Sequence, residues 1–514
     1  MDAEATLRRT AERTITEATT APQATAAVRA RTAPHETAAS RRSPSRWWAL
    51  ALLASAEFVV ILDTAVVNIA LPSIGRGLHI SLTNLSWVVN AYVLGFGGLL
   101  LLGGRVADRV GRRRIFVMGL AVFSLASFAG GMAQSSAWLI AARGIQGIGA
   151  AMLAPAALSL VTSIFREGAD RNRALSVWGA VGGSGAAAGV LFGGVLTSWL
   201  GWRSVLFVNV PIGITAMLLT PALITESRDE RAGRNFDLPG AITVTAGLSA
   251  LVFALVRAST LGWASPQTIG VLVAAAVLLS AFVVIEHRTR EPLVPFAFFR
   301  NLSVTAANAT MLGMGAATLG LFYFLSLYMQ RVLGYSAVTA GLSQLPIAGG
   351  TIVAAGLASP LVTRYGTRRV LLSGLMLLAG GLVWFAQLPV HGSYLTDLLP
   401  ASLLIALGVG FSFVPITILS QTGVGDHEYG LASGLVNTAQ EVGGALGLAV
   451  LATIVTSRTN HLAALHHPID QALTFGFHMG FLGAAGFVVL AAIAVAAIRS
   501  RDVDATPRRA TDAA

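Results

Sequence analysis

Asp63 is the residue of this chain whose position best predicts a chemical role. It lies near the middle of an apolar stretch from Trp47 to Ile74, which is long enough to cross a bilayer. A carboxylate at that depth is costly and is tolerated mainly where it faces a polar cavity, a partner or a proton path. Because a carboxylate can bind and release a proton, Asp63 predicts proton exchange within a membrane. The alternative is a paired acid on a buried helix of a soluble domain.

Arg143 is a second charged residue at membrane depth. At 1.5 Å per residue, Asp63 is expected about 16 Å and Arg143 about 10 Å from the outer ends of their spans. The difference is roughly one helical turn, so the two side chains can meet if their spans are neighbours. Arginine keeps its proton and therefore modulates a carboxylate without carrying protons. Gln146 shares the helix face of Arg143. A purely structural arginine, bonded to backbone carbonyls of a neighbouring helix, remains the alternative.

Two further acids lie in apolar spans. Glu57 precedes Asp63 by six residues, about 120° round a helix, so the two do not point in the same direction. Glu441 is followed closely by two glycines, which permit near contact between helices. We include both acids, with Asn68, as candidates for contact with a proton or a substrate. The alternatives are a solvated or paired acid at Glu57 and interhelical pairing at Glu441.

The composition indicates a membrane protein. Of the 514 residues, 54% are hydrophobic and only 11% are charged, whereas soluble domains carry about 25% charged residues. There is no cysteine, which excludes disulfides and thiolate sites. The net charge of +11 is spread over short loops, so we expect no nucleic-acid partner. No HExxH, GxSxG or P-loop sequence occurs, and we expect no enzyme activity, cofactor or metal site; His461, His466 and His467 are expected to be solvated in the longest outer loop.

Fourteen apolar segments recur between Trp47 and Ile498, which predicts an all-α polytopic membrane protein with 14 transmembrane helices. Every basic residue is an arginine, and 29 of them fall on the side of the termini against five on the other side. This distribution predicts that both termini are cytoplasmic. Residues 1–46 and 499–514 are poor in large apolar residues and are expected to be disordered tails.

A repeated segment indicates two related halves. GRVADRVGRR at 104–113 follows the second span, and RYGTRR at 364–369 follows the tenth. The spacing predicts six-helix bundles at 47–225 and 301–498, with two inserted helices in 226–300. Parallel repeats of this kind are a known transporter plan, with the substrate site at their interface.

The segment 104–113 is expected to act as a gating loop. Asp108 follows the end of the second span, and Arg112, with Arg113 beside it, can pair with this acid in one conformation only. Such a pair stabilises one side of an alternating-access equilibrium. Gly104 and Gly111 allow the tight turn and a close approach to a neighbouring span.

These segments carry a family resemblance. Residues 104–113 resemble the signature motif of the major facilitator superfamily, and LDTAVVNIALP at 62–72 resembles the first-span motif of its fourteen-span drug:proton antiporter branch, the EmrB/QacA type. RGIQGIGA at 143–150 is similar to the fourth-span motif, and GWR at 201–203 followed by FVNVP at 207–211 is typical of the branch.

The sequence departs from the family pattern at two positions. The fifth-span motif supplies a glycine face for helix packing, here Gly185, Gly189, Gly193 and Gly194, but Val190 replaces the usual proline. Thr363 stands in the second half where Asp108 stands in the first.

The resemblance implies a proton-coupled efflux transporter that exports drug-like amphipathic molecules by alternating access. Its partners would be the small substrate, protons and the lipid bilayer of the bacterial inner membrane. The proton gradient would supply the energy, no cofactor is expected, and the protein would be monomeric. Two alternatives remain: a dedicated exporter of one endogenous metabolite or siderophore, and a non-transporting membrane sensor.

Overall fold

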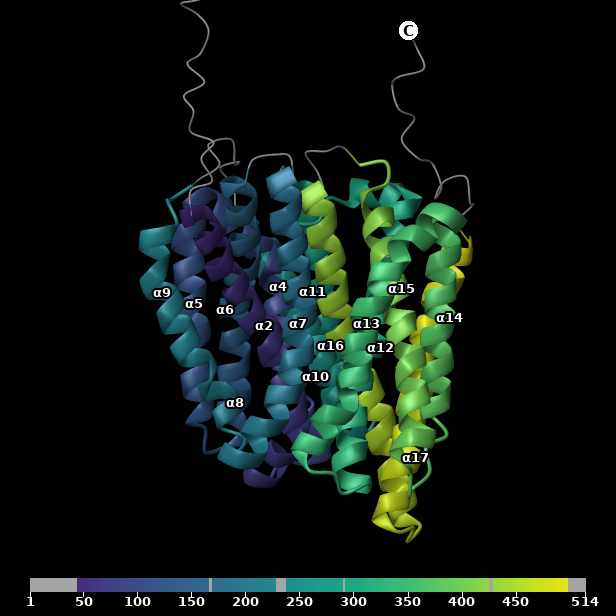
Figure 1. The fold of residues 1–514 in the computed structure, drawn as a ribbon. Helices are drawn as coiled ribbons and strands as arrows, with labels where there is room; N and C mark the ends of the chain where they lie inside the picture. Colours follow the sequence, from purple (N-terminus) through teal and green to yellow (C-terminus); the bar gives the residue numbers. More distant parts are fainter. Residues whose placement is uncertain (1–43, 166–168, 228–236, 290–291, 425–428, 498–514) are drawn as a thin grey trace, which may run out of the picture. The chain divides into compact units, whose positions relative to one another are not determined.

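Long helices account for most of the chain in the computed structural model, which describes residues 44–165, 169–227, 237–289, 292–424 and 429–497 (Figure 1). Apolar spans form helices because only a helix satisfies all backbone groups within one segment in lipid. Apart from the first turn of α2, the predicted tails lie outside the described residues. The helices are α2 (Pro44–Gly77), α3 (Leu82–Leu85), α4 (Trp87–Val110), α5 (Arg112–Gly131), α6 (Ser136–Ile164), α7 (Ala169–Leu200), α8 (Ser204–Phe207), α9 (Asn209–Leu223), α10 (Leu238–Leu261), α11 (Pro266–Arg288), η1 (Phe296–Arg300), α12 (Leu302–Leu327), η2 (Tyr328–Val332), α13 (Ala337–Tyr365), α14 (Thr367–Phe385), η3 (Tyr394–Leu398), α15 (Leu399–Gln421), α16 (Tyr429–Ala464) and α17 (Ile469–Ala497).

The helices correspond to the fourteen predicted spans. Within the described chain, 13 segments are long and apolar enough to cross a membrane, and α7 carries a shorter apolar segment, Ala187–Leu200. The sixth predicted span is divided into α8 and α9 at Val208. The described residues contain no strand. The predicted all-α polytopic fold is therefore confirmed.

Two predicted loops are shorter than expected, because the helices continue past their apolar cores. α4 extends to Val110, so most of the predicted gating loop is helical and the turn is made at Gly111, whose φ is +128°. A side chain rarely adopts this backbone conformation, and glycine adopts it readily. α16 extends to Ala464, which places His461 on a helix and leaves a connection of residues 465–468 in place of the predicted long loop.

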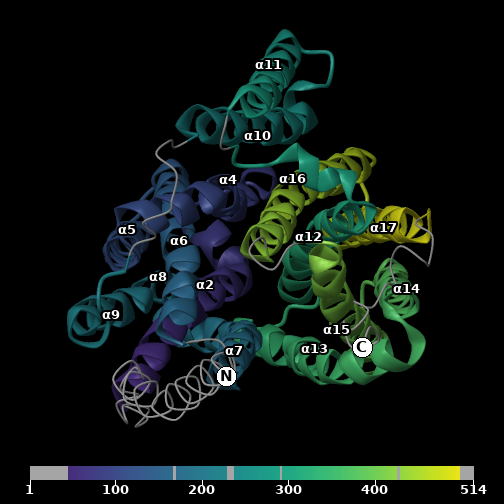
Figure 2. The same cartoon turned by 90° about the horizontal axis from the view of Figure 1, so that it is seen from above.

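Contacts divide most of the helices into two groups. In the first group α6 packs against α4 and α5, and α5 packs against α9; in the second, α12 packs against α16 and α17, and α15 against α13 and α14. The groups meet where α7 contacts α13 and where α4 contacts α16. The remaining pair, α10 and α11, pack together, and α10 lies beside both α4 and α16 (Figure 2). We call the end of the bundle with Gly111 the Gly111 face, and the opposite end, with Gly201, the Gly201 face.

Toward the Gly201 face, side chains of α12 and η2 bond to main-chain carbonyl groups of α2. Ser326 Oγ of α12 donates to the carbonyl oxygen of Asn68 at 3.0 Å, and Gln330 Nε2 of η2 donates to that of Ile69 at 2.9 Å.

Near these hydrogen bonds, α7 packs closely on α13. A Cβ built on Gly194 would lie 2.7 Å from Ala337 O, and one built on Gly341 would lie 2.5 Å from Val190 O, so glycine sets this spacing on both helices. α7 is helical through Val190, which packs with Ile69 and Ala337.

Candidate functional site

Asp63 lies at the centre of a buried polar network. Its side chain is 0% exposed, and its two oxygens accept three hydrogen bonds from two other helices. Arg143 Nη1 of α6 lies 2.5 Å from Asp63 Oδ2. Gln146 Nε2, also of α6, and Asn209 Nδ2 of α9 donate to Asp63 Oδ1 at 2.9 Å and 2.7 Å. The neighbouring spans and the near-equal depths thus bring Asp63 and Arg143 into direct contact.

Arg143 is fixed by hydrogen bonds and by an aromatic ring. It is 1% exposed, and besides the carboxylate its guanidinium donates to Val88 O of α4 at 3.1 Å and to Gln146 Oε1 at 2.8 Å. The ring of Tyr92, also from α4, covers the guanidinium with its centroid 4.3 Å from Cζ. An aromatic face attracts a cation most strongly where water is excluded. Arg143 therefore contacts both the carboxylate of Asp63 and a backbone carbonyl of a neighbouring helix, and these contacts are compatible with both of the roles that the sequence left open.

Two members of this network were not predicted from the sequence. Ser127 of α5 and Asn209 are both fully buried. Ser127 Oγ donates to Leu206 O at 2.8 Å and lies 3.0 Å from Asn209 Nδ2 and 3.3 Å from Gln146 Nε2. Asn209 carried a usable signal, because an amide inside an apolar span is costly unless bonded. Ser127 did not, since serine is common in spans and often bonds its own helix.

Glycines bring α7 against the part of α2 that carries Asp63. A Cβ on Gly189 would lie 2.6 Å from the Cβ of Ala65 and 2.9 Å from Leu62 O, and one on Gly193 would lie 2.9 Å from the Cα of Val66. Gly185 faces Ile61 and Phe58 O one turn earlier, while Gly194 faces α13. The first three of the four predicted packing glycines thus hold α7 next to the network.

The other predicted site residues lie outside the network. Glu57 is half-buried, and its Oε2 is buried without a hydrogen-bond partner. Glu441 of α16 contacts α4, where a Cβ on Gly97 would lie 2.6 Å from the Glu441 Cβ. Asn68 Nδ2 donates to Thr64 O of its own helix at 3.1 Å. Among the described residues, no hydrogen bond joins Glu57, Glu441 or Asn68 to Asp63.

The predicted gating residues meet at the Gly111 face. Arg112 Nε, at the start of α5, donates to Asp108 Oδ1, near the end of α4, at 2.8 Å across the turn at Gly111. Glu226, which the sequence analysis did not assign, accepts from the backbone N–H of Arg113 at 3.0 Å. A Cβ on Gly111 would lie 2.8 Å from this carboxylate. Glu226 follows an apolar span, where an acid is usually solvated. Its contact with Arg113 was therefore not predictable from the sequence.

Gly104 and the side chains of Arg113 and Arg114 also lie at the Gly111 face. Gly104 lies within α4, and a Cβ on it would contact Pro155 of α6 at 3.5 Å. Arg113 Nε and Arg114 Nε lie 3.9 Å and 3.7 Å from Glu226 Oε2. The turn between α4 and α5 is therefore tied to the segment that follows α9.

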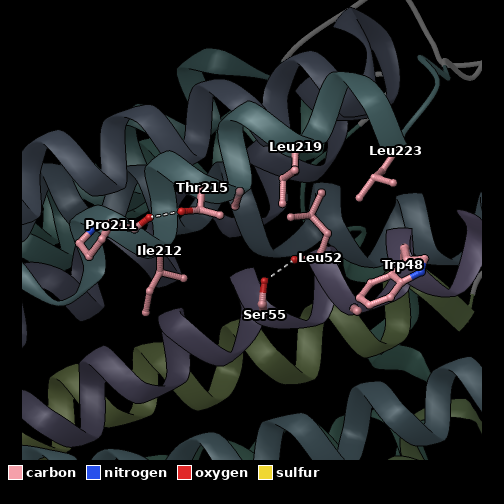
Figure 3. Close-up of a pocket in the computed structure, with 10 residues that line it drawn as sticks. Trp48, Leu52, Ser55, Pro211, Ile212, Thr215, Leu219 and Leu223 are labelled. Carbon is pink, nitrogen blue, oxygen red and sulfur yellow. Dashed lines mark hydrogen bonds between the residues drawn. The ribbon is translucent and has the colours of Figure 1, made fainter.

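A groove of about 420 Å³ lies between α2 and α9 (Figure 3). Its walls are mostly apolar, and its two hydroxyl groups bond to their own helices: Ser55 Oγ to Leu52 O at 2.8 Å, and Thr215 Oγ1 to Pro211 O at 2.7 Å. None of its lining residues belongs to the Asp63 network. The groove therefore offers an apolar surface and no ionisable group.

The network constrains what Asp63 can do chemically. An arginine and two amide donors all stabilise the ionised carboxylate. Removing one member of a buried ion pair leaves an uncompensated charge, which is strongly unfavourable. Loss of the charge on Asp63 would therefore leave Arg143 without its counter-charge. The buried ion pair also joins α2 to α6.

Comparison with known proteins gives the family. The family description "Major Facilitator Superfamily" matches residues 53–448, most of the chain. The chain belongs to the major facilitator superfamily. It is accordingly a multi-pass membrane transporter and not an enzyme. The fourteen-span layout fits the branch predicted from the motifs.

Relatives of this superfamily member include resistance and export proteins. The puromycin resistance protein of Streptomyces alboniger is 42% identical over 89% of this chain and 91% of its own length. The cephamycin export protein of Amycolatopsis lactamdurans is 42% identical over 87% and 91%. The lincomycin resistance protein of Streptomyces lincolnensis is 35% identical over 92% and 95%.

Solved transporter structures share the fold. A bacterial homologue of the human lysosomal transporter Spinster, inward-facing and unoccupied, superposes with a TM-score of 0.61 at 17% identity, covering 90% of this chain and 98% of that one. A peptide transporter of the POT family gives a TM-score of 0.65 at 16% identity, covering 87% and 96%.

Proposed function

We propose that the protein exports small amphipathic antibiotic-like molecules from a bacterial cell and is driven by protons through Asp63. The observation that carries this proposal is the buried contact between Asp63 and Arg143, which a membrane protein retains at high cost. Relatives at 42% identity bear the names of antibiotic resistance and export proteins, and this supports the direction and class of transport.

In the proposed cycle, a proton from outside neutralises Asp63 and releases Arg143, and the helices that hold the network change their packing. Loss of the proton to the inside restores the ion pair. Asp108 and Arg112 bias one state of this equilibrium. Glu57, Glu441 and Asn68 are candidates for substrate contact, because none of them is bonded to the network.

The setting is also part of the proposal. We place the protein in the bacterial inner membrane as a monomer with both termini cytoplasmic, which makes the Gly111 face cytoplasmic. Support for the orientation is the arginine distribution, since positive residues favour the cytoplasmic side. The proton gradient supplies the energy, and no cofactor takes part.

Asp63→Asn tests the proton role. Asparagine keeps the size and one oxygen acceptor but cannot titrate. In proteoliposomes, we expect the variant to lose export against a concentration gradient driven by a pH gradient, by about tenfold or more, while energy-independent exchange of labelled substrate continues.

Asp470→Asn is the matched control, because Asp470 is an exposed aspartate in the first turn of α17. It should export as the wild type does. If Asp63→Asn still concentrates substrate against its gradient, the coupling role passes to Glu57 or Glu441.

A dedicated exporter of one self-made compound is the second candidate function. It is favoured by a relative that is named for the export of a single compound, cephamycin. Measuring resistance of a deletion strain to a panel of unrelated antibiotics separates the two functions. Loss of resistance to several chemical classes supports a multidrug exporter, and loss to one class supports the dedicated exporter.

A further inference from the structure

The two inserted helices bring together a pair of acids that the proposed transport cycle does not use. Asp237 is the N-cap residue of α10 and is 2% exposed. Glu286 lies in the last turn of α11 and is 3% exposed. Sequence analysis passed over both, because acids at the ends of apolar helices are usually solvated.

Each carboxylate is bonded through one oxygen and leaves the other without a partner. Asp237 Oδ1 accepts from Gly240 N at 2.9 Å, and Glu286 Oε2 accepts from Val294 N at 3.1 Å. Asp237 Oδ2 and Glu286 Oε1 are buried with no hydrogen-bond donor. A Cβ on Gly240 would lie 2.5 Å from Asp237 Oδ2, so glycine leaves this oxygen its space.

The two carboxyl groups lie within hydrogen-bonding reach of each other. Two carboxylates at such a distance cannot both ionise easily, because like charges in a buried site repel strongly. One shared proton removes this repulsion and lets one carboxyl group donate a hydrogen bond to the other. With one proton the two carboxyl groups can bond to each other, and without it they repel each other.

The charged surroundings fit a pair that holds one negative charge. Within the described chain, the charges that act on Glu286 are those of Asp237 and of Arg105, which is part of α4. The Arg105 guanidinium also donates to Pro292 O, in the segment after α11. The ring of His287 packs on Phe296 with centroids 4.9 Å apart. Residues 228–236, which precede Asp237, lie outside the described chain.

We propose that Asp237 and Glu286 form a proton-binding site, separate from Asp63, that joins the ends of α10 and α11 beside α4. The bound proton lies in an O–H···O hydrogen bond between the two carboxyl groups, and the pair then carries one negative charge, which Arg105 balances. Release of that proton to water leaves two negative charges in hydrogen-bonding reach, and α10 and α11 separate at this end. A divalent cation is disfavoured, because it needs six or more oxygen ligands and Arg105 repels it.

Two conservative substitutions test the site in the full-length purified protein. Glu286→Gln keeps an oxygen for Val294 N, and Asp237→Asn keeps one for Gly240 N, while each new amide donates to the remaining carboxylate. We expect the infrared absorption of protonated carboxyl groups to decrease by the contribution of one group in each variant. Between about pH 6 and pH 9 the wild-type melting temperature should fall by about 2 °C or more beyond that of either variant.

Asp470→Asn and His287→Gln are the controls, and both should follow the wild-type pH profile. His287→Gln is included because His287 adjoins Glu286 in the chain. Equal pH profiles for the wild type and for both site variants would overturn the proposal, as would an unchanged carboxyl absorption in both. A wild-type melting temperature raised at high pH by calcium or magnesium, but not in the variants, would also overturn it in favour of a cation site.

Discussion

The side chain of Asn209 contributes two hydrogen bonds that nothing else in the described network replaces. Asn209→Ala leaves Asp63 Oδ1 with one donor fewer and deprives Ser127 of another. An unsatisfied buried group costs about 1–3 kcal/mol, so we expect a lower melting temperature and a several-fold loss of export. Asn84→Ala, at an exposed asparagine, is the control. Wild-type export and stability in Asn209→Ala would show that the network does not depend on α9.

Tyr92 acts through its ring, and its hydroxyl is buried without a partner. Tyr92→Phe keeps the ring over Arg143 and should leave the melting temperature and export near wild type. Tyr92→Leu removes the cation–π contact, which is worth about 2 kcal/mol where water is excluded, and should lower both. Thermal unfolding and proteoliposome flux of the two variants decide the matter. An equally large loss in Tyr92→Phe would assign the role to the hydroxyl.

At the scale of residues, the charged members of the network were predictable from the sequence, and the neutral members were predictable only in part. Asp63 and Arg143 are costly in lipid, and counting residues placed them at matching depths; Gln146 followed from helix periodicity. Ser127 was not recognisable, because a hydroxyl that bonds its own helix and one that bonds amide groups of other helices occur in the same sequence pattern. Buried acids at helix ends, such as Glu286, were missed for a similar reason: the solvated acid is far commoner at such a position.

Among the elements, α7 is the helix whose packing depends most clearly on glycine near Asp63. Gly189→Val would place its Cβ 2.6 Å from the Ala65 Cβ and push α7 away from α2. Overpacking of this kind costs about 1–3 kcal/mol or more, so we expect less folded protein and a lower melting temperature. The measurement is the yield of monodisperse protein and its thermal unfolding.

Gly349→Val is the matched control for that substitution. Gly349 also lies inside a long helix, α13, but nothing lies within 4 Å of the Cβ it would gain. The two variants share the intrinsic cost of valine in a helix and differ in packing. Equal behaviour of both would mean that the contact between α7 and α2 is adaptable.

The existence of the elements was predictable, and their ends were less so. The apolar runs predicted fourteen spans because a bilayer requires a minimum apolar length. They did not predict that α4 continues through Arg105 and Asp108 to Val110, since hydropathy falls before the helix ends. The break at Val208 also has no hydropathy signal, yet it starts a new helix at Asn209 and so brings this amide to Asp63.

For the whole molecule, the joined backbone at the Gly201 face predicts a measurable equilibrium. Ser326→Ala with Gln330→Ala removes the two side chains of α12 and η2 that donate to main-chain carbonyl groups of α2. Each hydrogen bond contributes about 0.5–1.5 kcal/mol, so losing both should favour opening at this face by about tenfold.

Cysteine labelling measures that opening, because the chain has no cysteine of its own. Ile69 is buried at the contact. In an Ile69→Cys variant, the rate at which the thiol reacts with a membrane-impermeant maleimide reports exposure at the Gly201 face. Thr318→Ala is the control, since Thr318 is on the same helix and bonds Met314 O of that helix. Unchanged labelling in the double variant would show that these bonds do not hold the face closed.

The acceptors in that contact are main-chain carbonyl oxygens, and this has an evolutionary consequence. Any residue at positions 68 and 69 of α2 presents the same two carbonyl groups to Ser326 and Gln330. A lineage can therefore replace the side chains at these two positions without losing the partners of Ser326 and Gln330. Side chains at these positions can thus vary while the hydrogen bonds at the Gly201 face are kept. The relatives of this chain are named for antibiotics as different as puromycin and cephamycin.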